Sequence, residues 1–321
     1  MELFDYKGYT EEKLLELCSS KNINIGKAEH IFWTSETYSF GEHYRNYCNF
    51  PKKLSLNIYS DHGIGNSTVY KHELKNNAPA IFLFSEKKMK NYKELSNKPC
   101  YLVLPPLISY RRKSRIKKSP NAKGTLAFPI HSTPSIDINF NIDSYIEKLK
   151  KLPEDMQPVC VSLHMHDINK GLHKKFIENN IPVYCAGNVA DIKFGERFYN
   201  ILKHFKYACS NAIGTYTYYA LDLDIPFSLV EEIFELNNIS DNNFEKGLIN
   251  CQTEEFKNIQ ELFKDGIYRK ITKEQKELLA QMTGGDKEIS PTKMKIILYR
   301  ALLKHKDGLK QIIKSLLRFK I

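Results

Sequence analysis

The chain of 321 residues contains no apolar stretch approaching the ~20 residues that a membrane-spanning helix needs. Its first eighteen residues carry acids and one short apolar cluster, so we expect no signal peptide. The composition is 42% hydrophobic and 26% charged, which is typical of a folded protein and argues against general disorder. These features predict a soluble cytoplasmic protein, long enough for two domains that each bury a core.

The seven cysteines are scattered and form no C-x-x-C pair. An odd, dispersed set in a chain of this size indicates reduced thiols in a cytoplasm. We therefore expect neither a disulfide framework nor a zinc site bound by cysteine.

Alternating strand-like and helix-like segments fill residues 122–230. The predicted strands are 125–130, 159–163, 182–185, 207–209 and 225–229, and the predicted helices are 142–152, 172–177, 194–205 and 215–223. This alternation predicts a parallel, doubly wound sheet with right-handed crossovers. Ligands of such sheets bind beyond the carboxyl ends of the strands.

One segment at such a strand end, containing Ser210, Asn211, Gly214 and Thr215, begins a predicted helix. Its small residues, hydroxyl groups and backbone N–H groups suit a phosphate, because helix amino termini attract anions. The competing interpretation is that Ser210 or Asn211 only caps the helix. The segment favours a nucleotide or another phosphate-bearing ligand.

The rest of the chain completes an α/β organisation. Residues 1–107 contain further strand-like segments at 28–34, 54–60, 80–84 and 101–104 and helix-like segments at 11–18 and 87–95, which predicts a first Rossmann-like domain. A basic stretch at 108–121 is the expected linker to the second such domain at 122–230. Residues 231–321 are expected to be a helical extension, with helices at 256–263, 273–281, 293–303 and 309–317.

Two groups of motifs carry a family resemblance. Phe128-Pro129-Ile130-His131-Ser132 follows the first strand of the second domain, and Ser210-Asn211, Gly214-Thr215, Tyr219-Ala220 and Ile225-Pro226 lie near its end. This third of the chain resembles the donor domain of GT-B glycosyltransferases that build bacterial surface polysaccharides such as capsule and O-antigen. The first third is similar more loosely, through Ser60-Asp61-His62-Gly63. The resemblance implies two Rossmann-like domains facing a cleft, with the acceptor bound by the first domain and a nucleotide-sugar by the second.

The resemblance also implies a general base in the first domain, and Asp61 takes that place. An inverting sugar transfer needs a base to deprotonate the acceptor hydroxyl, which contributes ~10²–10⁴-fold to the rate. His62 is an alternative base or orients Asp61, and Glu36 is a further candidate. The competing interpretation is that Asp61 forms an Asx-turn.

Histidines follow two predicted strands of the second domain. His131, next to Ser132, is placed to donate a hydrogen bond to phosphate and stabilise the departing nucleotide, or is a loop histidine that caps a helix. His164 is expected to contact a base or ribose, unless it lies in a solvated loop. The sequence around it shows no ligand set with metal spacing. The paired glutamates of retaining enzymes of this class are not matched either, because Glu231, Glu232 and Glu235 come too late and too close together. We therefore expect an inverting, metal-independent transfer with no cofactor beyond the nucleotide-sugar co-substrate.

The net charge of +11 is concentrated near the carboxyl terminus. Residues 293–321 carry nine Lys or Arg against one acid, with an apolar stripe at positions 297, 298, 302, 309, 312, 313, 316 and 317. Such a basic amphipathic helix is expected to bind the anionic inner face of a membrane, at ~1 kcal/mol per nearby cation. The alternative is a helix that packs on the protein core. Arg111 and Arg112, in a second basic run, are candidates for contacts with phosphate or an anionic acceptor, or are simply solvated.

The sequence therefore predicts a peripheral membrane glycosyltransferase that moves a sugar from a nucleotide-sugar to a lipid-linked surface glycan. The alternatives are a pyruvyl or glycerol-phosphate transferase acting on a similar glycan, and a non-catalytic scaffold of polysaccharide assembly. Nucleic-acid binding, suggested by the charge and the nineteen tyrosines, is not expected, because the excess charge is concentrated in the tail and no reader motif is present.

Overall fold

The computed structural model describes residues 4–23, 33–65, 67–230, 234–242, 244–249, 253–264, 266–285 and 287–317. The chain divides into two compact units, and each is described by itself. Unit 1 comprises Met1–Ser20, Arg115–Asn188 and Phe194–Leu279, and unit 2 comprises Lys21–Ser114, Val189–Lys193 and Ala280–Ile321. The units are interleaved along the chain, whereas the sequence predicted consecutive segments. The chain passes from unit 2 to unit 1 at Ser114, inside the stretch predicted to be the linker.

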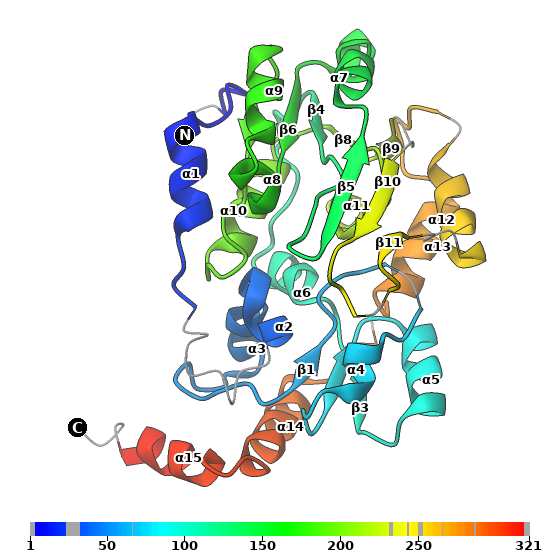
Figure 1. Cartoon of the computed structure of the whole chain (residues 1–321). Coiled ribbons are helices and arrows are strands. Elements are labelled where there is room, and N and C mark those ends of the chain that lie inside the picture. Colours follow the sequence, from blue (N-terminus) through cyan, green and yellow to red (C-terminus); the bar gives the residue numbers. More distant parts are fainter. Residues whose placement is uncertain are drawn as a thin grey trace. The chain divides into compact units, whose positions relative to one another are not determined.

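Unit 1 is built on five parallel strands in the order β7-β6-β4-β8-β9 (Figure 1). They are β4 (Thr125–Ala127), β6 (Val159–Ser162), β7 (Val183–Tyr184), β8 (Tyr207–Ser210) and β9 (Phe227–Leu229). The parallel sheet predicted for this region is confirmed. The chain runs outward from β4 to β7 and returns to the other side of β4 for β8 and β9. The loops that follow β4 and β8 therefore flank the switch point of the sheet, where doubly wound folds bind their ligands.

Amphipathic helices surround this sheet at close to the predicted positions. In unit 1 they are α1 (Glu11–Ser19), α7 (Ile142–Lys150), α8 (Met165–Asn169), α9 (Leu172–Glu178), α10 (Phe194–Leu202), α11 (Thr215–Asp222), α12 (Glu254–Lys264) and α13 (Lys273–Met282), which ends in unit 2, with a short 3-10 turn at Glu154–Met156. Helix α7 illustrates why they form. Asn141 caps its first turn by accepting from the backbone N–H of Ser144, and Tyr145, Ile146 and Leu149 share its buried face.

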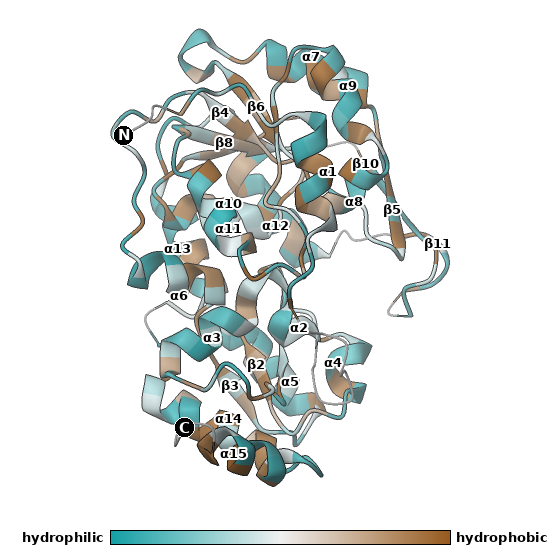
Figure 2. Ribbon diagram, turned by 90° about the vertical axis from the view of Figure 1, so that its left-hand side faces the viewer, coloured by the Kyte–Doolittle hydropathy of each residue, from teal (hydrophilic) through white to brown (hydrophobic). Residues whose placement is uncertain are grey.

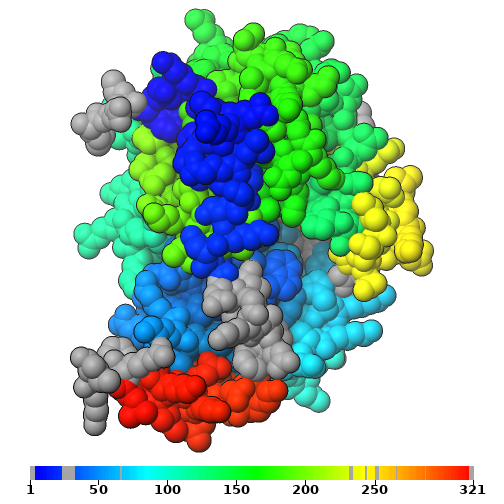
Figure 3. Space-filling view, turned by 60° about the vertical axis from the view of Figure 1, so that its left-hand side comes forward, coloured from blue at the N-terminus to red at the C-terminus, as the bar shows by residue number. Residues whose placement is uncertain are grey.

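The amino-terminal segment also belongs to unit 1. The backbone N–H of Tyr9 donates to the carbonyl oxygen of Val183 at 2.7 Å, so this segment covers edge strand β7. Gly8 has φ of 76°, and a Cβ there would lie 2.6 Å from the Val183 nitrogen, so only glycine allows this approach. Figure 3 shows α1, in dark blue, lying against the green helices of the same unit.

A second, antiparallel sheet in unit 1 was not predicted. It has the order β11-β10-β5 and consists of β5 (Ile136–Phe140), β10 (Phe234–Asn238) and β11 (Gly247–Leu248). Apolar and polar residues alternate in Ile-Asp-Ile-Asn-Phe of β5, as expected for a half-buried strand. The expectation that the chain is helical after residue 231 is therefore wrong for 234–248 and correct for the helices that follow.

Unit 2 contains a three-stranded parallel sheet in the order β1-β2-β3. Its strands are β1 (Tyr59–Ser60), β2 (Ile81–Leu83) and β3 (Cys100–Leu102), and its helices are α2 (Trp33–Glu36), α3 (Phe40–Cys48), α4 (Lys71–Lys75), α5 (Glu86–Leu95), α6 (Pro106–Lys113), α14 (Pro291–Leu303) and α15 (Gly308–Leu317), with a 3-10 turn at Thr37–Ser39. Tyr92 of α5 packs on Ile81 and Leu83 in the core. No helix among the described residues has both the length and the apolar character required to cross a bilayer.

Two predictions for unit 2 need correction. A strand was predicted over 28–34. Residues 28–32 lie outside the described part of the chain, and residues 33 and 34 begin helix α2. Most of the predicted linker's first half is helix α6, whose Leu107 and Ile108 are buried. Only the first turn of α6 buries apolar residues, which is why the sequence showed no helical periodicity there.

Candidate functional site

The loop after β4, residues 128–132, lies at the carboxyl edge of the five-stranded sheet and is held from both sides. Asn211 directly follows β8, and its Oδ1 accepts a hydrogen bond from the backbone N–H of Ile130 at 2.7 Å. Asp167 lies in α8, which follows β6, and its Oδ1 accepts from the backbone N–H of Ser132 at 3.2 Å. The structure thus brings the ends of three neighbouring strands, β6, β4 and β8, together at this loop.

The side chains of Asn211 and Asp167, which hold the loop in this way, each have one unsatisfied polar atom. Nδ2 of Asn211 and Oδ2 of Asp167 are buried and have no hydrogen-bond partner among the described residues. Asn211 is fully buried and Asp167 is 4% exposed. An unsatisfied buried polar group costs about 1–3 kcal/mol, so a fold retains such groups for a reason. This edge of the sheet therefore offers one donor and one acceptor on opposite sides of the same loop.

Two predicted histidines also meet here. The ring of His131 stacks on that of His164, with centroids 4.1 Å apart and planes at 15°. His131 Nδ1 lies 3.0 Å from the carbonyl oxygen of Ser132. Burial, with the nearby His131 and His166, lowers the pKa of His164 well below its usual value. A neutral His164 can stack on His131 without charge repulsion, which leaves the half-buried His131 as the imidazole nearer to solvent.

The electrostatics of Asp167 differ from those of a paired acid. Burial raises the pKa of its carboxyl group, although the N–H and hydroxyl groups of Ser132 and the charges of His131 and Lys170 act in the opposite direction. Lys170 does not pair with it, because the Lys170 ammonium group contacts Asp137. Asp167 therefore has charged neighbours but no ion pair among the described residues. Sequence reasoning named His164 and missed Asp167, three residues further along the same strand-end segment.

Ser210, a predicted phosphate ligand, has a structural role in this conformation. It is fully buried, and its Oγ donates to the carbonyl oxygen of Phe128 at 2.5 Å. The same Oγ accepts from the backbone N–H of Ala212 at 3.1 Å and lies 2.9 Å from the Tyr216 hydroxyl. These contacts tie Ser210 to the loop that follows β4. The N-cap of α11 is Gly214, so the interpretation that Ser210 or Asn211 caps this helix is wrong.

Gly214 and Thr215 lie at the amino terminus of α11, as predicted. Gly214 is the N-cap, and its N–H donates to the Thr217 side chain at 3.2 Å. A Cβ at position 214 would lie 2.7 Å from the Tyr216 ring, which explains the glycine. The positive end of the α11 dipole thus lies at the same sheet edge as Asn211.

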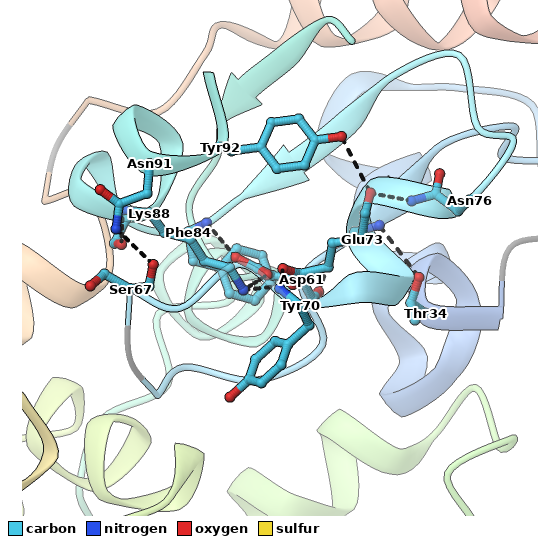
Figure 4. A network of polar contacts seen from close by, with 12 residues as sticks. Thr34, Asp61, Ser67, Tyr70, Glu73, Asn76, Phe84, Lys88, Asn91 and Tyr92 are labelled. Carbon is cyan, nitrogen blue, oxygen red and sulfur yellow. Dashed lines mark hydrogen bonds and ion pairs between the residues drawn. The ribbon is translucent and has the colours of Figure 1, made fainter. Parts of the chain in front are cut away.

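The predicted base, Asp61, lies at the carboxyl end of β1 in unit 2 and is 3% exposed. Figure 4 shows its network: Oδ1 accepts from Lys88 Nζ at 2.6 Å, and Oδ2 accepts from the backbone N–H of Phe84 at 3.1 Å. Lys88 Nζ also donates to Glu73 Oε1 at 2.6 Å. Both oxygens of Asp61 are therefore engaged by residues far along the chain, which is a structural role other than the Asx-turn of the competing interpretation.

One lysine in this network serves two carboxylates. Burial raises the pKa of Glu73 to about 7 against the attraction of Lys88, and the charge of Asp61 raises it further. Burial alone would lower the pKa of Lys88, but Asp61 and Glu73 raise it above the usual value. The network is therefore an ion triad with an excess of negative charge.

Two further candidates in unit 2, His62 and Glu36, have their own described contacts. His62 is exposed, with its ring 5.5 Å from Trp33 and 6.4 Å from His72. Glu36 is buried in a bidentate ion pair with Arg45, at 2.7 and 2.6 Å, which is a structural role.

Arg111 and Arg112 lie in the last turn of α6. Arg111 is half-buried and Arg112 is exposed. Burial raises the pKa of Glu288 to about 7, and the charge of Arg112 acts against this shift. Over the described part of the chain, no group of three or more His, Cys, Asp or Glu side chains is arranged to hold a metal ion.

The fold and this edge define an α/β protein whose doubly wound parallel sheet carries unsatisfied polar groups at its switch point. No protein-family model and no curated protein matches the chain. Among solved structures, the wall teichoic acid polymerase TagF is similar, with 10% sequence identity and a TM-score of 0.33, over 82% of this chain and 67% of that chain. At this TM-score the likeness carries no argument, and the function is argued from the chain's own residues.

Proposed function

We propose that the protein is a glycosyltransferase that binds a nucleotide-sugar at the carboxyl edge of the five-stranded sheet in unit 1. The observation that carries the proposal is the pair of buried, unsatisfied atoms, Asn211 Nδ2 and Asp167 Oδ2, on either side of the loop at 128–132. A nucleotide-sugar has phosphate oxygens that accept and hydroxyl groups that donate, so it satisfies both. The sugar-nucleotide class also fits the sequence motifs of this region.

Each group at the edge has a role in this proposal. The Nδ2 donor of Asn211 and the amino terminus of α11 bind phosphate oxygens. His131, a half-buried residue of the loop, donates a hydrogen bond to the phosphate that leaves with the nucleotide. Such a donor stabilises the charge that develops in the transition state, and removal of one such donor typically costs about 10²–10³ in rate.

The general base of the transfer is proposed from unit 2. Asp61 and His62 are the candidates, in an inverting reaction without a metal ion. His62 is exposed, whereas Asp61 is bound to Lys88. Because its imidazole is exposed, His62 is the member of the pair that we propose as the base.

The acceptor is proposed to be a lipid-linked surface glycan at the inner face of the cell membrane. The apolar stripe predicted near the carboxyl terminus has two parts. In α14, Ile297, Leu298 and Leu302 are buried in unit 2. In α15, four large apolar side chains are 48–64% exposed: Leu309, Ile313, Leu316 and Leu317. Figure 2 shows that α15 carries both hydrophobic positions, in brown, and hydrophilic ones, in teal. Lys310 and Lys314 of the same helix add charge that suits anionic lipid.

A nucleotide panel tests the proposed donor site. Thermal unfolding is measured with UDP, GDP, TDP, CMP and ADP. A ligand at 100 times its dissociation constant stabilises by about 2.7 kcal/mol, or a few degrees. We expect one nucleotide to raise the midpoint, and Asn211→Asp to abolish the shift. This variant keeps the oxygen that accepts from Ile130 but replaces the donor with a negatively charged acceptor.

Asn200→Asp is the matched control. Asn200 is exposed on α10 of the same unit, so its substitution adds the same charge away from the sheet edge. We expect it to bind the nucleotide as the wild type does. No stabilisation by any nucleotide, or equal shifts in the two variants, would contradict the proposal.

A further inference from the structure

Asp167 has a feature that binding of phosphate does not explain. Asp167 is only 4% exposed, and its Oδ1 accepts from the backbone N–H of Ser132, whose hydroxyl group also acts on the carboxylate. The other oxygen, Oδ2, has no hydrogen-bond partner within the described ranges. The lysine one helical turn away, Lys170, contacts Asp137 instead. A buried carboxylate without an ion pair is costly, so its retention points to a partner supplied from outside the chain.

The chemistry of that partner follows from the charge. A carboxylate accepts hydrogen bonds and repels phosphate, so the ligand group that faces Asp167 carries O–H or N–H donors. The phosphate belongs on the opposite side of the loop, where Asn211 offers a donor and α11 begins. The two sides therefore orient a ligand that is anionic at one end and hydroxylated at the other.

We propose that Oδ2 of Asp167 accepts a hydrogen bond from a hydroxyl group of a sugar ring of the ligand, and so fixes its direction across the sheet edge. This inference rests on the proposed nucleotide-sugar site and names the group that Asp167 recognises. The sugar ring is either the ribose of the nucleotide or the sugar that is transferred. Asp167 is a binding residue and has no part in the proton transfer.

The inference has a consequence for the unliganded protein. Asp167→Asn keeps an oxygen that accepts from Ser132 and removes the buried charge. If the carboxylate serves a ligand, the variant unfolds at the wild-type temperature or above it, because the free protein no longer buries an unsatisfied carboxylate. If the carboxylate serves the fold, the variant unfolds at a clearly lower temperature, and the inference fails.

Binding to defined nucleotides provides the direct test. Titration calorimetry compares UDP, GDP and CMP with their 2′-deoxyribose counterparts and with UDP-glucose, on the wild type and Asp167→Asn. If Asp167 binds the ribose, the wild type prefers the ribose form by about 10- to 100-fold, the range for a hydrogen bond to a charged group. Asp167→Asn then binds ribose and deoxyribose forms alike. If Asp167 binds the transferred sugar, the variant loses a similar factor only for the nucleotide-sugar.

Asp155→Asn is the matched control. Asp155 precedes β6, at the amino-terminal end of the strand, and pairs with Arg269 at 2.8 Å on the surface. It should leave every one of these affinities unchanged. Wild-type affinity and discrimination in Asp167→Asn would overturn the inference while the nucleotide site stands. Failure of every nucleotide to bind the wild type would instead remove the proposed function itself.

Discussion

Replacement of Lys88 by methionine should strongly destabilise unit 2. Lys88 Nζ lies 2.6 Å from both Asp61 and Glu73, and the three side chains are only 4–8% exposed. The substitution keeps most of the aliphatic stem but leaves two buried carboxylates without a cation. Breaking a buried ion pair in this way costs about 3–5 kcal/mol.

The expected shift in melting temperature is large and depends on pH. For a unit of roughly 150 residues, each kcal/mol lowers the midpoint by about 2–4 °C, so the full loss is about 6–20 °C. Protonation of the carboxylates relieves their repulsion. The loss should therefore be greatest near pH 8 and smaller near pH 5.

Differential scanning calorimetry at these two pH values measures the effect. Lys90→Met is the control, since Lys90 is an exposed lysine on the same helix. Equal melting temperatures of Lys88→Met and Lys90→Met at pH 8 would show that the triad does not contribute to stability. That result would refute the structural role assigned to Asp61.

Two further predictions concern Glu73 and α15. Because the pKa of Glu73 is raised to about 7 in the folded protein, its contribution to stability is present at low pH and is lost as pH rises from about 4.5 through about 7. Chemical unfolding from pH 4.5 to 8 measures this pH dependence of the free energy of unfolding, which amounts to at most about 1.4 kcal/mol per pH unit. Glu73→Gln should remove the dependence, whereas the exposed control Glu86→Gln should retain it. Leu316→Asp should reduce sedimentation with phosphatidylglycerol vesicles by about 10-fold or more without lowering the melting temperature, because Leu316 is 64% exposed. Leu248→Asp, at a 74% exposed position in unit 1, should bind vesicles as the wild type does, and equal binding of both variants would exclude α15 as the contact.

The fold of unit 1 was largely predictable because its signal is local. Buried parallel strands appear as short apolar runs between amphipathic helices, and all five were located to within a few residues. The antiparallel sheet was missed because β5 pairs with β10, a partner far along the chain that the pattern of either segment does not reveal. Long-range pairing also places the amino-terminal segment beside β7.

The sites were harder to predict, because the same residue type serves either ligand or fold. Asp61 ends a strand, as predicted, but the sequence does not show that Lys88 and Glu73 converge on it. Ser210 lies at the predicted edge, yet its Oγ is bound to Phe128. The apolar stripe near the carboxyl terminus runs through both α14 and α15, and the sequence does not show that its α14 part is buried while its α15 part is exposed.

The central claim is that a nucleotide-sugar binds at the switch point of the five-stranded sheet. Its most direct test is a crystal structure of the protein with the nucleotide that stabilises it. We predict phosphate oxygens within hydrogen-bond distance of Asn211 Nδ2, beside the first turn of α11. A nucleotide bound at any other place, with Asn211 Nδ2 and Asp167 Oδ2 still unsatisfied or bound only to water, would contradict the account.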